Sequence, residues 1–174
     1  YGRLLTESPG TEQAKEAQLH IAESYYNAKQ YEKAIKEYEK FIETYPEDSR
    51  KEQALEGIKL CYYEKASGEG SSDVGLEDFV NRYPGENLAG EAYWQLGVRS
   101  FEKGEYIKAI DNFQKVIVDY PHVSSAKLAS YYLGEAYYAL KKFAEAIKAF
   151  QNFVSGYPED ELTETAKFHL ANGF

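Results

Sequence analysis

The chain contains no methionine and only one cysteine, Cys61, in 174 residues. A single cysteine excludes an internal disulfide and a cysteine-based zinc site, because both require further thiols. The three histidines are scattered, without the spacing of a base beside a nucleophile. We therefore expect Cys61 to be a small buried apolar group. Because residue 1 is tyrosine and methionine is missing, we also expect the chain to be a piece of a longer protein.

Positive charge is scarce, since 20 Lys and Arg stand against 29 Asp and Glu, for a net charge of −9 and a pI near 4.9. This balance argues against binding nucleic acid or anionic lipid by bulk electrostatics. No apolar run approaches the roughly 20 residues that span a bilayer, and no signal sequence is present. We predict no nucleic-acid partner and no direct membrane span.

Catalytic motifs are missing as well. The sequence has no metal-spaced cluster of His, Cys and carboxylates, no glycine-rich phosphate loop and no serine elbow. We predict that the chain is not an enzyme and that it has no cofactor, no catalytic residues and no metal site.

Proline occurs only five times, and the five residues are almost evenly spaced along the chain. Successive prolines are 37, 38, 37 and 37 residues apart. An alanine stands eight residues after each proline, and Ile or Leu stands twelve residues after it. A register held over this length is typical of stacked repeats rather than of one irregular domain. The prolines are Pro9, Pro46, Pro84, Pro121 and Pro158.

Each period contains two helical patterns. Between Pro84 and Pro121, apolar residues recur at three- and four-residue spacing on both sides of Gly104. The glycine can adopt a positive φ at a helix C-terminus, and Tyr120-Pro121 ends the second helix because proline disfavours an α conformation in the residue before it. The sequence therefore predicts one antiparallel helix hairpin per period.

These residues resemble the tetratricopeptide repeat (TPR), with the pattern L-G-x-x-Y, then A-x-x-x-F, then P. The resemblance implies an all-α fold, a right-handed α-solenoid of antiparallel helix hairpins. The period is about three residues longer than the usual ~34. This long form is similar to repeats in bacterial envelope proteins, namely the C-terminal domain of the periplasmic Tol–Pal coordinator and the outer-membrane assembly lipoprotein BamD. The best match comprises Leu133, Gly134, Tyr137, Ala146, Phe150 and Pro158.

The prolines also predict the boundaries of the repeats within a single array, 1–174. One repeat departs from the pattern, because glycine and serine in residues 66–73 weaken helix propensity. We expect its first helix at Glu52–Lys65 and a late second helix from Asp73 to about Arg82. The irregular stretch is either a plain loop or a functional hinge or partner-binding loop. The expected divisions are 1–9 (end of a preceding repeat), four repeats at 10–46, 47–84, 85–121 and 122–158, and 159–174 (first helix of a further repeat).

The resemblance implies that the first helices line a concave groove that binds extended or helical peptides. Many of the residues at the groove positions are aromatic or acidic, and the alternative for each aromatic is that it packs between neighbouring repeats. Carboxylates there disfavour a clamp for a C-terminal carboxylate and favour an apolar partner with basic residues. The candidate partner-binding residues are Glu23, Tyr26, Tyr63, Trp94, Phe101, Tyr131, Glu135 and Tyr138.

The resulting prediction is a non-catalytic protein–protein interaction module, a scaffold in a bacterial cell-envelope or outer-membrane assembly, located in the periplasm or at the outer membrane. Three alternatives remain open: a structural spacer within a longer TPR protein, a cytoplasmic TPR scaffold, and a hydrolase that is regulated by the array or fused to it. The incomplete repeats at both ends also predict end-to-end self-association.

Overall fold

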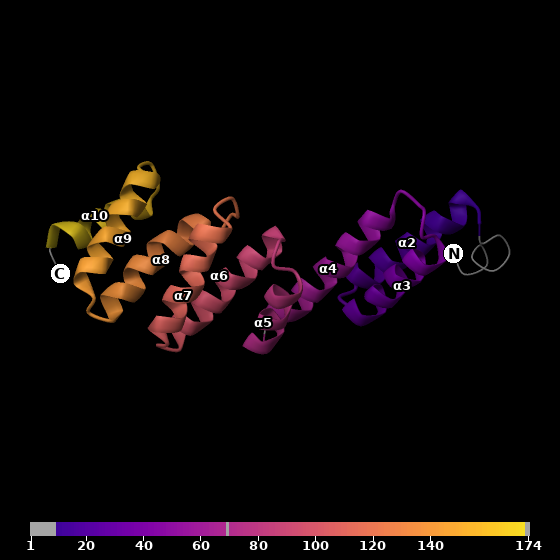
Figure 1. The fold of residues 1–174 in the computed structure, drawn as a ribbon, viewed down its shortest axis with the longest axis horizontal. Coiled ribbons are helices and arrows are strands. Elements are labelled where there is room, and N and C mark those ends of the chain that lie inside the picture. The colour runs from indigo at the N-terminus through magenta and orange to yellow at the C-terminus, as the bar shows by residue number, and fades with distance from the viewer. Residues whose placement is uncertain (1–9, 69, 173–174) are drawn as a thin grey trace. The chain divides into compact units, whose positions relative to one another are not determined.

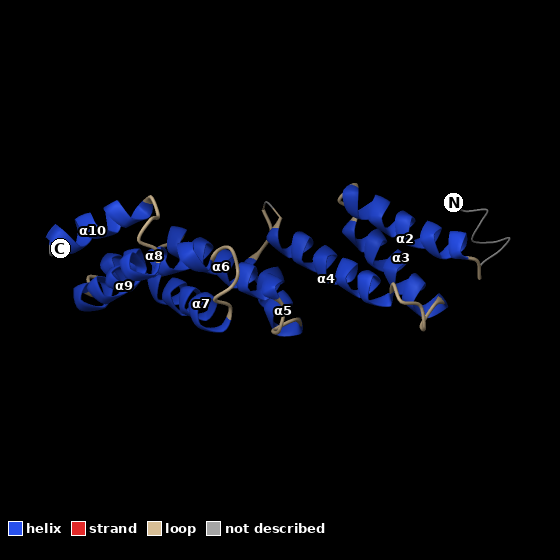
Figure 2. Cartoon of the chain, turned by 90° about the horizontal axis from the view of Figure 1, so that it is seen from above, coloured by secondary structure: helices blue, strands red, loops and turns tan. Residues whose placement is uncertain are grey.

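The computed structural model describes residues 10–68 and 70–172, and every regular element in them is an α-helix (Figures 1 and 2). Residues 1–9, predicted to end a preceding repeat, lie outside the described residues. In chain order the helices are α2 (Glu12–Asn27), α3 (Tyr31–Thr44), α4 (Lys51–Ser67), α5 (Asp73–Arg82), α6 (Asn87–Glu102), α7 (Tyr106–Asp119), α8 (Ala126–Ala139), α9 (Phe143–Gly156) and α10 (Leu162–Asn172).

Consecutive helices pack as hairpins, α2 with α3, α6 with α7 and α8 with α9. The second helix of a hairpin also packs against the next first helix, as α3 does on α4, α7 on α8 and α9 on α10. The prediction of an all-α solenoid of helix hairpins is confirmed, whereas the boundaries of the individual repeats stay a prediction. No helix within the described residues is both long and apolar enough to cross a membrane.

The chain forms two compact units, unit 1 (Tyr1–Gly75) and unit 2 (Leu76–Phe174). Their boundary falls within α5, which begins and ends where the sequence predicted. Helix α4 extends two residues further than predicted, through Ala66 and Ser67. The extension has a packing reason, since Ala66 is buried and lies next to Gly75. The Ser71 hydroxyl donates a hydrogen bond to the Ala66 carbonyl, which satisfies one of the acceptors at the helix end.

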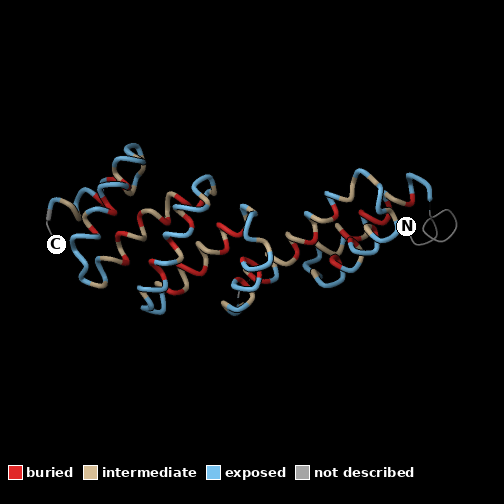
Figure 3. Tube along the Cα trace, in the orientation of Figure 1, coloured by how far each residue is buried: buried red, intermediate tan, exposed pale blue. Residues whose placement is uncertain are grey.

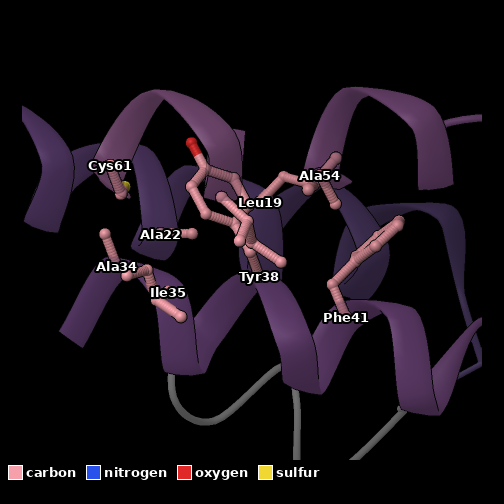
Figure 4. Packing of buried hydrophobic residues seen from close by; sticks show 9 residues of the cluster. Leu19, Ala22, Ala34, Ile35, Tyr38, Phe41, Ala54 and Cys61 are labelled. Carbon is pink, nitrogen blue, oxygen red and sulfur yellow. The ribbon is translucent and has the colours of Figure 1, made fainter. Parts of the chain in front are cut away.

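The core of unit 1 is a cluster of side chains from three helices (Figure 4). Phe41 and Tyr38 of α3 lie between small residues of α2 and α4. Gly57 of α4 makes room for Tyr38, because a Cβ there would lie 2.5 Å from the phenol ring. Burial raises the pKa of Tyr38 to about 12. Cys61 is buried as predicted, and burial raises the pKa of its thiol to about 11.

In unit 2, one glycine in each hairpin lets the two helices approach closely. A Cβ at Gly97 would lie 2.5 Å from the Phe113 ring, and one at Gly134 would lie 2.7 Å from the Phe150 ring. Such distances are incompatible with any larger residue unless the ring moves. The buried residues follow the inward faces of the helices, while the connecting turns are mostly exposed (Figure 3).

The turn that closes each hairpin requires a left-handed residue. Gly104 has φ 76° at the end of α6, as the sequence predicted. Lys29 and Lys141 hold the corresponding places after α2 and α8, with φ 56° and 59°. In all three turns the following backbone N–H groups bond back to the last turn of the helix, which is the usual way to satisfy its terminal carbonyls.

Candidate partner-binding face

The first helices of successive hairpins lie side by side in each unit, α2 beside α4 in unit 1 and α6 beside α8 in unit 2. We call the surface that these helices present the first-helix face of each unit. The four helices contain all eight residues that the sequence proposed for partner binding, three in unit 1 and five in unit 2.

In unit 1 the structure brings Glu23 of α2 close to α4. Glu23 Oε1 accepts a hydrogen bond of 3.2 Å from Gln53 Nε2, and Glu23 Oε2 lies 3.0 Å from His20 Nδ1. Its side chain remains 39% exposed. Tyr26 and Tyr63 are half-buried, and Tyr26 packs against Tyr31 at a ring distance of 5.8 Å. Unit 1 therefore presents one carboxylate and two partly accessible phenol rings.

In unit 2 Trp94 and Phe101 are half-buried because both pack on the next hairpin. Tyr132 of α8 lies 5.5 Å from Trp94 and 5.6 Å from Phe101, measured between ring centres. Trp94 also contacts Phe113 of its own hairpin at 5.5 Å. Both residues therefore pack against neighbouring rings and remain partly accessible.

Tyr131 is buried, whereas the sequence proposed it as an accessible partner-binding residue of the groove. Its exposed fraction is 8%, because the ring packs against Phe150 and Phe153 of α9 at 5.7 and 5.5 Å. Burial and the neighbouring Glu135 carboxylate raise the pKa of Tyr131 well above its usual range. Tyr131 thus packs within its own hairpin, and we exclude it from the site.

Glu135 and Tyr138 both face α10. Glu135 Oε1 lies 3.2 Å from His169 Nε2, and each of these side chains is 23% exposed. Tyr138 is 40% exposed and contacts Phe143 and His169 at ring distances of 5.9 and 5.7 Å. Tyr138 therefore keeps an accessible surface, whereas Glu135 is engaged inside unit 2.

Sequence reasoning missed Tyr132 and His169, which organise these contacts. The two residues are 37 apart, so they hold the same place in successive repeats. That register was visible in the sequence, but the position was not among those proposed for binding. The described residues contain no group of three or more His, Cys, Asp or Glu that could hold a metal ion.

Two family models match the chain. Residues 16–48 match a tetratricopeptide repeat model, and residues 85–171, half of the chain, match the YfiO model, described as an outer membrane lipoprotein. The chain belongs to the YfiO family of tetratricopeptide repeat proteins. No curated protein matches this YfiO-family chain. A solved structure titled "MamA RS-1 ArsTM double mutant" is 16% identical, covers 91% of this chain and 92% of its own, and has a TM-score of 0.47.

TPR and YfiO domains are non-catalytic scaffold modules, and TPR domains bind protein partners. The YfiO-family match therefore supports a protein–protein interaction scaffold.

Proposed function

We propose that this protein is a scaffold that holds a protein partner on its first-helix faces within a bacterial cell-envelope assembly. The observation that carries the proposal is the YfiO match over unit 2, together with half-buried aromatic rings on the face that the first helices share. Large rings give contact area at small entropic loss and are enriched among residues that dominate binding energy. The proposed contacts are Glu23, Tyr26 and Tyr63 in unit 1 and Trp94, Phe101 and Tyr138 in unit 2.

The partner that suits these faces is an apolar peptide or helix with basic residues. Glu102 is exposed next to Phe101, and Glu23 is partly exposed near Tyr26, so cations on the partner would meet carboxylates beside the rings. The net charge of −9 adds a long-range attraction for a basic segment. Binding of this kind weakens as salt concentration rises.

A site-specific crosslinking experiment tests the face. A photoreactive residue at Glu102 or Tyr138 lies on the first-helix face of unit 2, while one at Val118, which is 73% exposed on α7, serves as the matched control. We expect the same protein to crosslink from Glu102 and Tyr138 and not from Val118. Capture from Val118 alone would contradict the proposed face, and capture from none of the three would favour a structural spacer.

The captured partner then allows a binding test in purified form. Glu102→Lys should weaken binding several-fold at low salt because it reverses an exposed charge without disturbing the core. Val118→Lys is the control and should leave the affinity unchanged. Unchanged binding by Glu102→Lys would remove the electrostatic part of the proposal.

The envelope location is a second part of the proposal and has its own test. It rests on the YfiO family, whose description is an outer membrane lipoprotein. Fractionation of cells that produce the full-length protein should place it with periplasmic or outer-membrane markers. Recovery with cytoplasmic markers would instead favour a cytoplasmic scaffold.

A further inference from the structure

One register position of the first helices holds a tyrosine in α2, α4 and α8 and a serine in α6. The tyrosines are Tyr25, Tyr62 and Tyr137, and all three are half-buried. The serine is Ser100, which lies 75 residues after Tyr25 and 37 before Tyr137. Ser100 is 3% exposed, so the position points into the array in this hairpin as well. The array therefore lacks one phenol ring at a place where three other first helices supply it.

A cavity lies beside Ser100. It has a volume of about 290 Å³ and is lined by residues of α5, α6 and α7 that all belong to unit 2. Its apolar lining includes Val80 and Leu96, both buried, and the half-buried Tyr93. An apolar cavity of roughly 150 Å³ already holds a benzene ring. The cavity beside Ser100 is therefore large enough for the phenol ring of a tyrosine.

A lysine at the rim of this cavity holds a place from which another lysine contacts a tyrosine ring. Lys33 of α3 has its Nζ 5.5 Å from the centre of the Tyr25 ring, a cation–π contact. Lys108 of α7 lies 75 residues after Lys33 and lines the cavity. Its Nζ lies 3.9 Å from the Glu77 carboxylate, and its side chain is 57% exposed. Lys108 can therefore contact the face of a ring that enters the cavity.

A carboxylate at the rim holds the place of a residue that contacts a tyrosine hydroxyl. Gln114 Nε2 of α7 donates a hydrogen bond of 3.0 Å to the Tyr137 hydroxyl. Glu77 of α5 lies 37 residues before Gln114 and lines the cavity. A carboxylate accepts a hydrogen bond from a phenol O–H, and such a charge-assisted bond is stronger than a neutral one. The rim therefore favours a phenol over a ring that has no hydroxyl.

We propose that this cavity binds a tyrosine side chain of a protein partner, in the place that Tyr25 and Tyr137 fill in their own hairpins. The ring packs against Val80 and Leu96, while the hydroxyl donates to Glu77. A protein is the source of the ring because the family match supports a protein–protein interaction scaffold. The inference rests on that scaffold role but not on the first-helix faces, so each proposal can fail without the other.

Nuclear magnetic resonance of the purified protein tests the cavity with three probes: p-cresol, toluene and N-acetyltyrosinamide. We expect p-cresol and N-acetyltyrosinamide to shift amide signals around Leu96, Ser100 and Asp111, which line the cavity. Toluene should bind roughly three- to tenfold more weakly than p-cresol, because it has no hydroxyl for Glu77. No binding, or equal binding of toluene and p-cresol, would overturn the proposal. Binding of p-cresol without N-acetyltyrosinamide would overturn the assignment to a tyrosine side chain.

Variants assign the probe to the cavity. Asn81→Trp replaces an exposed residue of the lining and should lower the affinity for p-cresol by roughly tenfold or more, because the indole covers the cavity. Val118→Trp is the matched control, since Val118 lies 37 residues after Asn81 and is not part of the lining. Ser100→Tyr should abolish binding by supplying the missing ring from the chain itself. Glu77→Ala should remove the preference for p-cresol over toluene.

The two blocking variants act from different sides of the cavity. Asn81→Trp changes an exposed side chain, so it keeps the test decisive even if Ser100→Tyr fails to fold. Unchanged p-cresol binding by Asn81→Trp, or by a folded Ser100→Tyr, would overturn the proposed site. An equal loss of binding in Val118→Trp would do the same.

Discussion

The α2–α4 contact of unit 1 and the α6–α8 contact of unit 2 use different chemistry at the same register position. In unit 1, Asp48 lies before α4, forms an ion pair of 2.9 Å with Lys15 of α2 and accepts a hydrogen bond of 2.7 Å from Arg50 Nε. In unit 2, 75 residues further on, the corresponding places hold Val123 and Gly90. A Cβ at Gly90 would lie 2.8 Å from Val123 Cγ1, so the contact there is apolar and tight.

An ion pair at this register position is found again within unit 2. Lys127 of α8 forms an ion pair with Asp160, which lies before α10 and also accepts a hydrogen bond of 2.9 Å from the Leu162 N–H. One register position therefore carries either a cation beside an aspartate or a glycine beside a valine. The backbone arrangement is common to both, and complementarity between the two residues matters more than the identity of either one.

Adding a methyl group at Gly90 should have the largest effect on stability, because it disrupts the apolar contact with Val123. We expect Gly90→Ala to destabilise unit 2 by roughly 1–3 kcal/mol, because the new methyl group would lie 2.7 Å from Tyr120 Cβ. Urea unfolding followed by circular dichroism measures the change. Gly156→Ala, with no atom within 4 Å of the new Cβ, is the matched control and should cause no loss. A Gly90→Ala variant as stable as wild type would show that the contact is loose.

Removing the negative charge of Asp48 in unit 1 should have the next largest effect on stability. The Asp48 side chain is 6% exposed, and Asp48→Asn should destabilise unit 1 by about 1–3 kcal/mol at neutral pH because charged hydrogen bonds are lost. Asp119→Asn is a suitable control, since Asp119 forms a more exposed pair with Lys115 and should change stability by less than ~0.5 kcal/mol. Equal losses of stability in Asp48→Asn and Asp119→Asn would mean that the Asp48 contact contributes no more than a surface ion pair.

The same aspartate gives unit 1 an acid sensitivity. Hydrogen bonds from Arg50 and Lys15 hold the pKa of Asp48 well below its usual range. A lowered pKa in the folded state means that the stabilisation is complete above the unfolded value, near ~3.9, and is lost as pH falls below it. Urea midpoints of wild type and Asp48→Asn should therefore converge below about pH 4. A constant difference down to low pH would contradict the ionic account of this contact.

The smallest effects should come from the hairpin turns, where different hairpins hold different residues at one position. Lys29 in unit 1 and Lys141 in unit 2 have positive φ where Gly104 stands in the hairpin between them. Lys141→Gly should stabilise by about 0.5–1 kcal/mol, and Gly104→Ala should destabilise by about 1 kcal/mol. Thermal unfolding of the two variants should give shifts of opposite sign. Shifts of the same sign would mean that the turn conformation is not the controlling factor.

Local features of this fold could be predicted from the sequence because they depend on residues a few positions apart. The late start of α5, the positive φ of Gly104 and the end of α7 before Tyr120-Pro121 all follow from short-range preferences for backbone conformation. The burial of Cys61 was predictable because the corresponding places in two other repeats hold the small residues Ser24 and Ala136. These features required no knowledge of which side chains meet.

The candidate site was less predictable because exposure depends on the size of distant neighbours. Trp94 and Tyr131 hold one register position, yet Trp94 is half-buried and Tyr131 is 8% exposed. Tyr131 packs against Phe153, whereas the place corresponding to Phe153 beside Trp94 holds the smaller Val116. The difference is a matter of packing across the hairpin, which the register alone does not specify.

The sequence by itself determined the period, the helical class and the phase of each helix, since proline, glycine and apolar spacing act through the local backbone. The tertiary structure decided which of the proposed residues remain accessible, and it divided the chain into two compact units within α5. It also paired Glu135 with His169, which lies 34 residues later. The corresponding places in the preceding repeat hold Val98 and Tyr132. Pairing at that distance depends on how helices pack, because side chains far apart in the chain meet only when the hairpins have docked.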